Sequence, residues 1–153
     1  MISLNDLATP LNGLVVAILR SRLHFLASRG LMVVAWSGRK TGRPFSIPVG
    51  YQPHGDALIV LISKPSAKSW WKNFQSPWPA ELQVRGEGRS AMGEVIPVGS
   101  PEFFEHCERT LQRLPWMGSQ FGGFRYDRAT GLDDEQRAIL CEHVGAVRFE
   151  FLD

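Results

Sequence analysis

The chain has 153 residues, of which 44% are hydrophobic and 21% charged, and this composition is typical of one soluble globular domain. A chain of this length can fold without crosslinks, and its two cysteines exclude a disulfide-rich scaffold and a four-cysteine zinc site. The formal net charge is only +2, but residues 1–80 carry nine Lys/Arg against two Asp/Glu, whereas residues 81–153 carry eight against thirteen. The basic half favours an anionic partner, although solvated surface charge would explain it as well.

The first 29 residues predict an amphipathic helix. The apolar run at residues 14–19 ends at Arg20 and is far shorter than the roughly 20 residues of a membrane span. No basic residue precedes it, as one would in a secretory signal, so we expect a cytoplasmic protein. The helix would pack on the core, while the arginines beside its stripe leave weak peripheral membrane contact open. The stripe consists of Leu11, Leu14, Val15, Ile18, Leu19, Leu23 and Leu26.

The rest of the chain predicts six strands and three helices. The strands are expected at residues 31–36, 45–51, 57–62, 80–85, 90–98 and 144–151, and the helices at 66–74, 101–114 and 133–143. Tight turns are expected at residues 53–56 and 86–88, and Ser100 is the expected cap of the second helix. Because the strands follow one another as hairpins without β-α-β alternation, we predict an antiparallel barrel with flanking helices, a mainly β (α+β) single domain over residues 1–153.

One long irregular stretch, residues 115–131, interrupts this pattern. It contains aromatic residues, among them Trp116, Phe121 and Tyr126. Loops of such length in compact domains are often lids or binding loops, so a lid is the expectation here, with simple packing as the alternative.

The segment from Ser37 to Pro44 predicts an anion-binding loop. Gly38 and Gly42 allow a sharp turn with exposed backbone N–H groups, and Arg39, Lys40 and Arg43 add three positive charges. Arginine forms paired hydrogen bonds with phosphate or carboxylate. The glycine spacing does not match a P-loop, whereas a DNA minor-groove arm and an ordinary charged hairpin remain alternatives.

A second segment, residues 63–74, places an indole beside an amide. Trp70 and Asn73 are three residues apart and would share one face of a helix. A flat heterocycle could stack on the indole while the amide contacts its polar edge. The alternative is that Trp70 and Trp71 anchor the core.

Taken together, these segments resemble the deazaflavin-dependent nitroreductase family of split β-barrel flavin/deazaflavin oxidoreductases. The resemblance covers about residues 10–98 and depends on the element Gly38-Arg39-Lys40-Thr41-Gly42 and the pair Trp70 and Asn73. It implies a six-stranded antiparallel split β-barrel of the FMN-binding type, with an N-terminal helix and flanking helices.

The resemblance also implies a cofactor and its site. Members of the family bind coenzyme F420, a deazaflavin with a phosphate and an acidic tail, and FMN is the alternative used by relatives with the same barrel. The basic glycine element would hold the phosphate and tail, Pro48 and Trp70 with Asn73 would lie beside the ring, and Ser63 and Lys64 would end a strand next to it. Family members often carry a basic residue where this chain has Phe45, and Arg43 is the candidate replacement.

The expected reaction is hydride transfer from reduced F420 to a small hydrophobic acceptor such as an enone, a quinone or a nitro compound. The cofactor supplies the hydride, so no catalytic triad is required. Ser63 and Tyr126 are the hydroxyls that would supply or relay the accompanying proton.

Two other functions are weighed against this one. A carrier would hold F420, FMN, haem or a fatty acid without turnover, and a nucleic-acid-binding protein would use the basic hairpin, although we expect no nucleic-acid partner. The spacing of cysteine and histidine residues predicts no metal site, and we expect a monomer or a homodimer.

Overall fold

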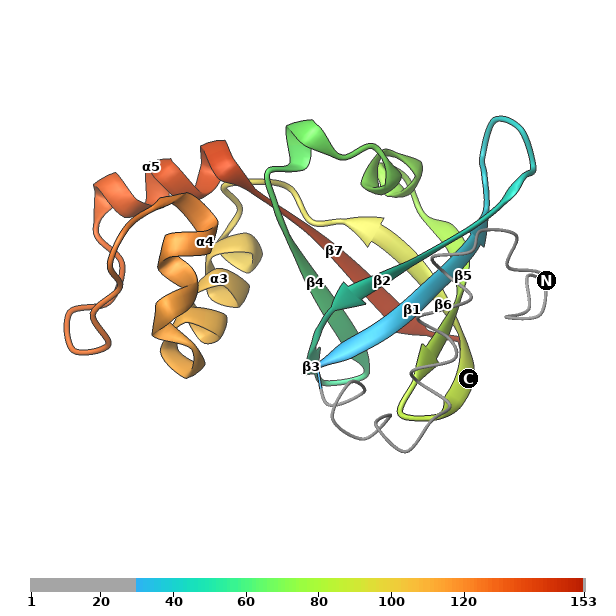
Figure 1. Ribbon diagram of the computed structural model, residues 1–153, viewed down its shortest axis with the longest axis horizontal. Coiled ribbons are helices and arrows are strands. Elements are labelled where there is room, and N and C mark those ends of the chain that lie inside the picture. The colour runs from blue at the N-terminus through green and yellow to red at the C-terminus, as the bar shows by residue number, and fades with distance from the viewer. Residues whose placement is uncertain (1–29, 153) are drawn as a thin grey trace.

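The computed structural model describes residues 30–152, which form one antiparallel sheet and a group of helices beside it (Figure 1). The predicted N-terminal helix and its membrane contact lie outside the described residues. The sheet has the strand order β2-β1-β5-β6-β7-β4-β3. Its strands are β1 (Leu31–Ser37), β2 (Pro44–Gly50), β3 (Gln52–His54), β4 (Ala57–Ser63), β5 (Trp78–Val84), β6 (Glu87–Val95) and β7 (Val144–Phe151).

The sheet curls into a half-barrel around an apolar core. Although β2 and β4 are far apart in the strand order, they contact each other across the curl. Alternate residues of β1, namely Met32, Val34 and Trp36, point into this core and meet the inward residues of β4, such as Val60. The two-residue period of a strand therefore places one apolar face of each strand inside the barrel.

Three α-helices form a lobe against the outer face of the sheet. They are α3 (Pro101–Arg113), α4 (Gly118–Gly122) and α5 (Asp134–His143), and short 3₁₀ helices η2 (Pro65–Ala67), η3 (Trp70–Phe74) and η4 (Pro115–Met117) complete the described fold. The lobe encloses a second core, in which Phe103, Leu111 and Leu140 pack on Ile59 and Ala146 of the sheet. None of the described helices is long and apolar enough to cross a membrane.

The helix ends follow the expected capping chemistry. The Ser100 hydroxyl accepts a hydrogen bond from the backbone N–H of Phe103 at 3.2 Å, which confirms its predicted role. At the start of α5, Asp133 and Gln136 form a reciprocal capping box. These two caps define where the helices of the lobe begin.

The sheet has seven strands rather than the predicted six. The additional strand is β3, and two of its three residues, Pro53 and His54, belong to the segment predicted as a turn. Its first residue, Gln52, pairs with Ile59 of β4. Pro53 and Gly55 indicated a turn, but Pro53 lies in an edge strand, where a missing backbone donor costs little. Pro48 likewise lies in β2, the other edge strand of the sheet.

Two other expectations are corrected by the structure. Residues 66–74 do not form one helix, because Lys64 is left-handed and Lys68 is extended, and this leaves the separate turns η2 and η3. Residues 115–131 do not form one irregular loop, because η4 and α4 occupy their first half. The β5–β6 turn consists of Arg85 and Gly86, so Gly88 belongs to β6 rather than to the turn.

Candidate functional site

The tip of the β1–β2 hairpin, residues 38–43, is a compact basic loop. The Gly38 N–H donates to the Arg43 carbonyl at 2.7 Å, and the Gly42 N–H donates to the Gly38 carbonyl at 2.9 Å. Gly42 has a φ of +71°, which favours glycine. The Thr41 hydroxyl accepts from the Arg43 N–H at 3.3 Å. The loop is therefore held by its own backbone, and the side chains of Lys40 and Arg43 are exposed.

Arg39 connects this loop to η3 and to the residues that follow it. Its backbone N–H donates to Oδ1 of Asn73 at 2.8 Å, and its Nε donates to the Asn73 carbonyl at 3.3 Å. One terminal nitrogen donates to the carbonyls of Ser76 and Pro77 at 2.8 and 3.2 Å. The guanidinium also lies 4.3 Å from the ring centre of Trp78. We call this set of contacts the Arg39 brace.

The brace brings the two sequence-predicted elements together, but it changes their roles. Arg39 directs its fork at backbone carbonyls rather than outward, so it is a connector and not a free anion ligand. The Asn73 amide likewise faces the loop. Its Nδ2 is buried and has no hydrogen-bond partner among the described residues.

Aromatic side chains support the brace from inside the barrel. Trp36 is 2% exposed, stacks on Phe45 at 5.7 Å between ring centres, and lies 6.1 Å from Trp70. Trp70 also contacts Phe74, so its indole is part of the core edge. Phe45 is 45% exposed and presents an aromatic ring beside the loop.

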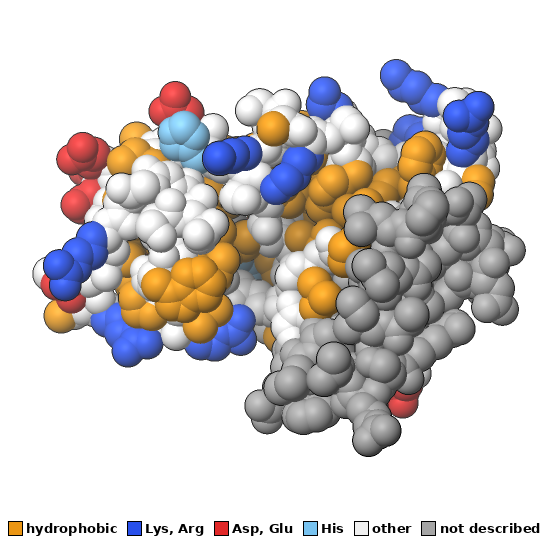
Figure 2. Space-filling model, in the orientation of Figure 1, with side chains coloured by type: hydrophobic (Ala, Val, Ile, Leu, Met, Phe, Trp, Pro, Cys, Tyr) orange, Lys and Arg blue, Asp and Glu red, His pale blue; other side chains and the backbone are white. Residues whose placement is uncertain are grey.

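Free positive charge gathers along the same edge of the barrel. The side chains of Lys40, Arg43 and Lys64 make no hydrogen bond or ion pair with another residue of the described chain. Lys72 lies 5.9 Å above the ring of Trp71, while the Lys68 ammonium donates to the Ser63 carbonyl at 2.7 Å. Blue side chains along the upper edge of the molecule mark this basic rim in Figure 2.

No acidic residue interrupts the segments that form the basic rim. Asp56 is the only Asp or Glu between residues 37 and 76, and it lies in the β3–β4 turn. That turn is at the opposite end of β4 from Ser63 and Lys64. Because the side chains of Lys40, Arg43 and Lys64 are exposed and form no ion pair within the described residues, they attract anions most strongly at low ionic strength.

The other predicted residues fall into two groups. Ser63 and Lys64 end β4 at the rim, and Lys64 adopts a left-handed conformation with a φ of +52°. Pro48 lies midway along β2, paired with Val33 of β1, and is half-buried. These three therefore lie on the barrel, as does the Arg39 brace.

Tyr126 lies elsewhere, in the core of the helical lobe. It is 5% exposed, its hydroxyl donates to Glu108 at 2.8 Å, and it accepts from Gln112 at 2.6 Å. Burial, together with Glu108, raises the pKa of Tyr126 to about 12. The structure thus does not bring Tyr126 together with the basic loop. Tyr126 instead packs in the core of the helical lobe.

Sequence reasoning did not single out Trp78 as part of the site, and it considered Phe45 only as a position where a basic residue is missing. The Trp78 indole N–H donates to the Ser37 carbonyl at 2.7 Å, and its ring lies under the Arg39 guanidinium. The sequence feature that could have indicated Trp78 is its position between Pro77 and Pro79, because the two prolines restrict the backbone on both sides of the tryptophan. A pocket of about 320 Å³ lies beside it, lined by Ala35, Glu81 and Ser90 among others.

Comparison with known proteins relates this geometry to a fold. No protein-family model matches the chain, and no curated protein matches it. Among solved structures, it is similar to the F420-H2-dependent reductase FDR-A, with a TM-score of 0.56, 12% identity, and coverage of 80% of this chain and 95% of that one.

Two further solved structures share the architecture. An FMN-binding protein of Nostoc punctiforme, related to pyridoxamine 5′-phosphate oxidase, has a TM-score of 0.54 and 13% identity over 95% of this chain and 82% of its own. The haem storage protein HutZ of Vibrio cholerae has a TM-score of 0.52 and 12% identity, and the match covers 85% of this chain and 87% of HutZ. At these identities the comparisons establish the split β-barrel fold and nothing finer.

Proposed function

We propose that this protein is an oxidoreductase that binds reduced coenzyme F420 at the basic rim and reduces a small hydrophobic acceptor. FMN is the alternative cofactor. The observation that carries the proposal is the Arg39 brace, which joins the basic loop and the Trp70–Asn73 segment into one edge of the barrel. The split β-barrels of similar fold, whose names specify F420-H2 or FMN, support the same class of cofactor.

The groups on the rim fit an anionic, partly aromatic cofactor. Lys40, Arg43 and Lys64 are exposed cations without acidic partners in the described chain, as a phosphate or an acidic tail requires. Phe45 offers an exposed ring, and the buried Nδ2 of Asn73 is a donor that still lacks an acceptor. Lys40, Arg43 and Phe45 lie at or beside the basic loop, Asn73 supports this loop, and Lys64 directly follows β4.

Each part of the chain then has a defined task. Lys40 and Arg43 bind negative charge, while Arg39 keeps the loop in place through backbone carbonyls. A bound deazaflavin or flavin supplies the hydride. The acceptor also gains one proton, and we assign the relay of this proton to the hydroxyl of Ser63, which is half-buried at the end of β4.

Binding and turnover test the proposal with the full chain. Oxidised F420 and FMN are titrated separately into the wild type and into the double variant Lys40→Ala, Arg43→Ala, with fluorescence as the readout. Loss of two charged contacts is expected to weaken binding by about tenfold or more at low salt. Turnover is followed as oxidation of reduced F420 in the presence of menadione or cyclohexenone.

The matched control is Arg125→Ala, which removes an exposed arginine from the helical lobe. It should bind like the wild type, and added salt should erase the difference between the wild type and the double variant. Binding without oxidation of reduced F420 by any acceptor would favour the carrier. Failure of the wild type to bind either cofactor would overturn the proposal.

A further inference from the structure

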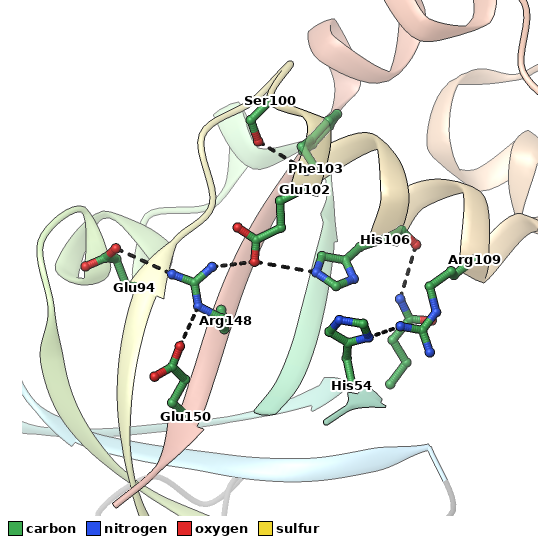
Figure 3. Close-up of polar contacts among 10 residues, drawn as sticks. His54, Glu94, Ser100, Glu102, Phe103, His106, Arg109, Arg148 and Glu150 are labelled. Atoms are coloured by element: carbon green, nitrogen blue, oxygen red, sulfur yellow. Dashed lines mark hydrogen bonds and ion pairs between the residues drawn. The ribbon is translucent and has the colours of Figure 1, made fainter. Parts of the chain in front are cut away.

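A pair of histidines joins helix α3 to the outer face of the sheet, away from the basic rim (Figure 3). His54 ends β3 and His106 lies in the middle of α3. Their rings meet edge to face with 4.9 Å between centres. His106 is only 1% exposed, whereas His54 is exposed and contacts the guanidinium of Arg109 from the same helix. Arg109, His54 and His106 thus form a row.

Arg109 holds the ring of His54 beside the buried ring of His106. Its guanidinium contacts Nδ1 of His54 and can only donate hydrogen bonds, so the imidazole is the acceptor in this contact. The contact also places a positive charge at the outer end of the row, beyond the ring that packs on His106.

The surroundings of His106 also favour its neutral form. Its Nδ1 is buried without a partner in the described chain, so a doubly protonated ring would bury an unsatisfied N–H. Its Nε2 lies 3.6 Å from Oε1 of Glu102, but the same oxygen is the hydrogen-bond acceptor of Arg148. Burial lowers the pKa of His106 from its ordinary value and His54 lowers it further, against the opposing effects of Glu102 and Glu105.

Other charged groups near the pair lie beyond Glu102. Arg148 of β7 is 3.0 Å from Glu150 and 3.6 Å from Glu94 of β6, so its charge is shared among three carboxylates (Figure 3). Glu150 is exposed and Glu94 is half-buried, so solvent screens them in part. These carboxylates surround Arg148, and Glu102 alone contacts His106.

Neutral side chains complete the joint and connect it to a cleft. Gln52 of β3 donates to the His106 carbonyl at 3.1 Å and accepts from the Thr110 hydroxyl at 2.7 Å. Gln52 and Thr110 also line a cleft of about 260 Å³ between the sheet and the lobe, with Leu114 and Met117 on its helical side. The position of α3 against β3 therefore determines the width of this cleft.

We propose that the His54–His106 pair makes the attachment of α3 to the sheet an acid-sensitive joint, which loosens the helical side of the cleft below about pH 6.5. The direction follows from linkage. Because burial makes His106 bind a proton less readily while α3 is docked than after α3 has detached, where histidine titrates near its ordinary pH of about 6.5, docking is complete above that pH and weakens as the pH drops through it. The one proton excluded from His106 raises the equilibrium constant for detachment of α3 by up to about tenfold for each pH unit of acidification.

Hydrogen exchange of the full chain at pH 7.5 and 5.5, corrected for the intrinsic pH dependence, tests the joint. Amides of α3 should lose protection on acidification while those of α5, in the same lobe, lose less. His54→Gln and Arg109→Gln should both reduce the loss, since the first removes the ring that opposes protonation of His106 and the second removes the positive charge at the outer end of the row. In urea unfolding from pH 8 to 5, the wild type should likewise lose more stability on acidification than His54→Gln or Arg109→Gln.

His143→Gln is the matched control, because His143 is an exposed histidine on α5 outside the joint. It should retain the acid sensitivity of the wild type. Equal loss of protection in α3 and α5, or identical pH profiles for His54→Gln and His143→Gln, would overturn the proposal. If His106→Gln folds, it should lose as little protection as His54→Gln. The comparison of His54→Gln with His143→Gln tests the proposal without this variant.

Discussion

Arg39 illustrates how the local environment decides the role of a side chain. Arginine is suited to phosphate and carboxylate because its donors form a rigid fork. Here the fork meets the carbonyls of Asn73, Ser76 and Pro77, and the flat guanidinium lies over Trp78. These groups satisfy most of its donors, so binding of an anion by Arg39 would require the brace to open.

Replacing Arg39 with lysine tests this role at the residue scale. One ammonium cannot reach the same three carbonyls, so Arg39→Lys should lower the free energy of unfolding by about 1 kcal/mol while the charge is retained. Arg43→Lys, at a side chain without described contacts, should change it by less than about 0.5 kcal/mol. Urea denaturation and hydrogen exchange of residues 38–43 measure both effects, and equal results for the two variants would contradict the brace.

At the scale of elements, the β5–β6 hairpin shows a local mismatch. Val84 pairs with Glu87, so the turn has two residues, Arg85 and Gly86, with φ values of +51° and +80°. Two positive φ values define a type I′ turn, which asparagine followed by glycine suits best. Glycine is in place at the second position, but arginine occupies the first, where its Cβ atom crowds the backbone carbonyl and no local side-chain hydrogen bond compensates as it can for asparagine.

Arg85→Asn should therefore stabilise the protein by about 0.5–1 kcal/mol, because asparagine adopts the left-handed conformation at lower cost. The change also removes a charge, so Arg85→Gln serves as the control and should leave stability nearly unchanged. Thermal unfolding monitored by circular dichroism distinguishes them. A similar gain from both variants would show that charge rather than backbone strain is responsible.

At the scale of the whole molecule, one sheet carries two cores. The barrel core includes Leu82 and Val60, whereas the lobe core includes Leu111 and Ile59, and adjacent residues of β4 thus belong to different cores. The first half of β7, residues 144–147, is likewise buried on both faces. Because the two cores share these strands, we expect the lobe and the barrel to unfold together.

Leu111→Ala in the lobe and Leu82→Ala in the barrel test this expectation. Both side chains are at most 1% exposed, and each truncation should cost about 2–5 kcal/mol. Tryptophan fluorescence reports largely on the barrel and far-ultraviolet circular dichroism on the helices, and the two transitions should coincide in both variants. If Leu111→Ala separated them, the lobe would be an independent unit.

The amino-acid sequence determined most of the elements of this protein. Five of the six predicted strands and both C-terminal helices needed only small changes at their ends, because apolar periodicity and caps such as Ser100 act over a few residues. The basic loop was also visible, since glycine and clustered cations are local features. Strand β3 was missed because pairing with β4, rather than its own composition, makes Gln52–His54 a strand.

Only the tertiary structure decided which residues meet. It placed Arg39 on the carbonyls beyond η3, brought His54 against His106, which is 52 positions later in the chain, and put Tyr126 in the lobe rather than at the rim. Contacts of this kind depend on how the sheet curls and where α3 docks. No local pattern specifies them, because they arise from the packing of segments that are distant in sequence.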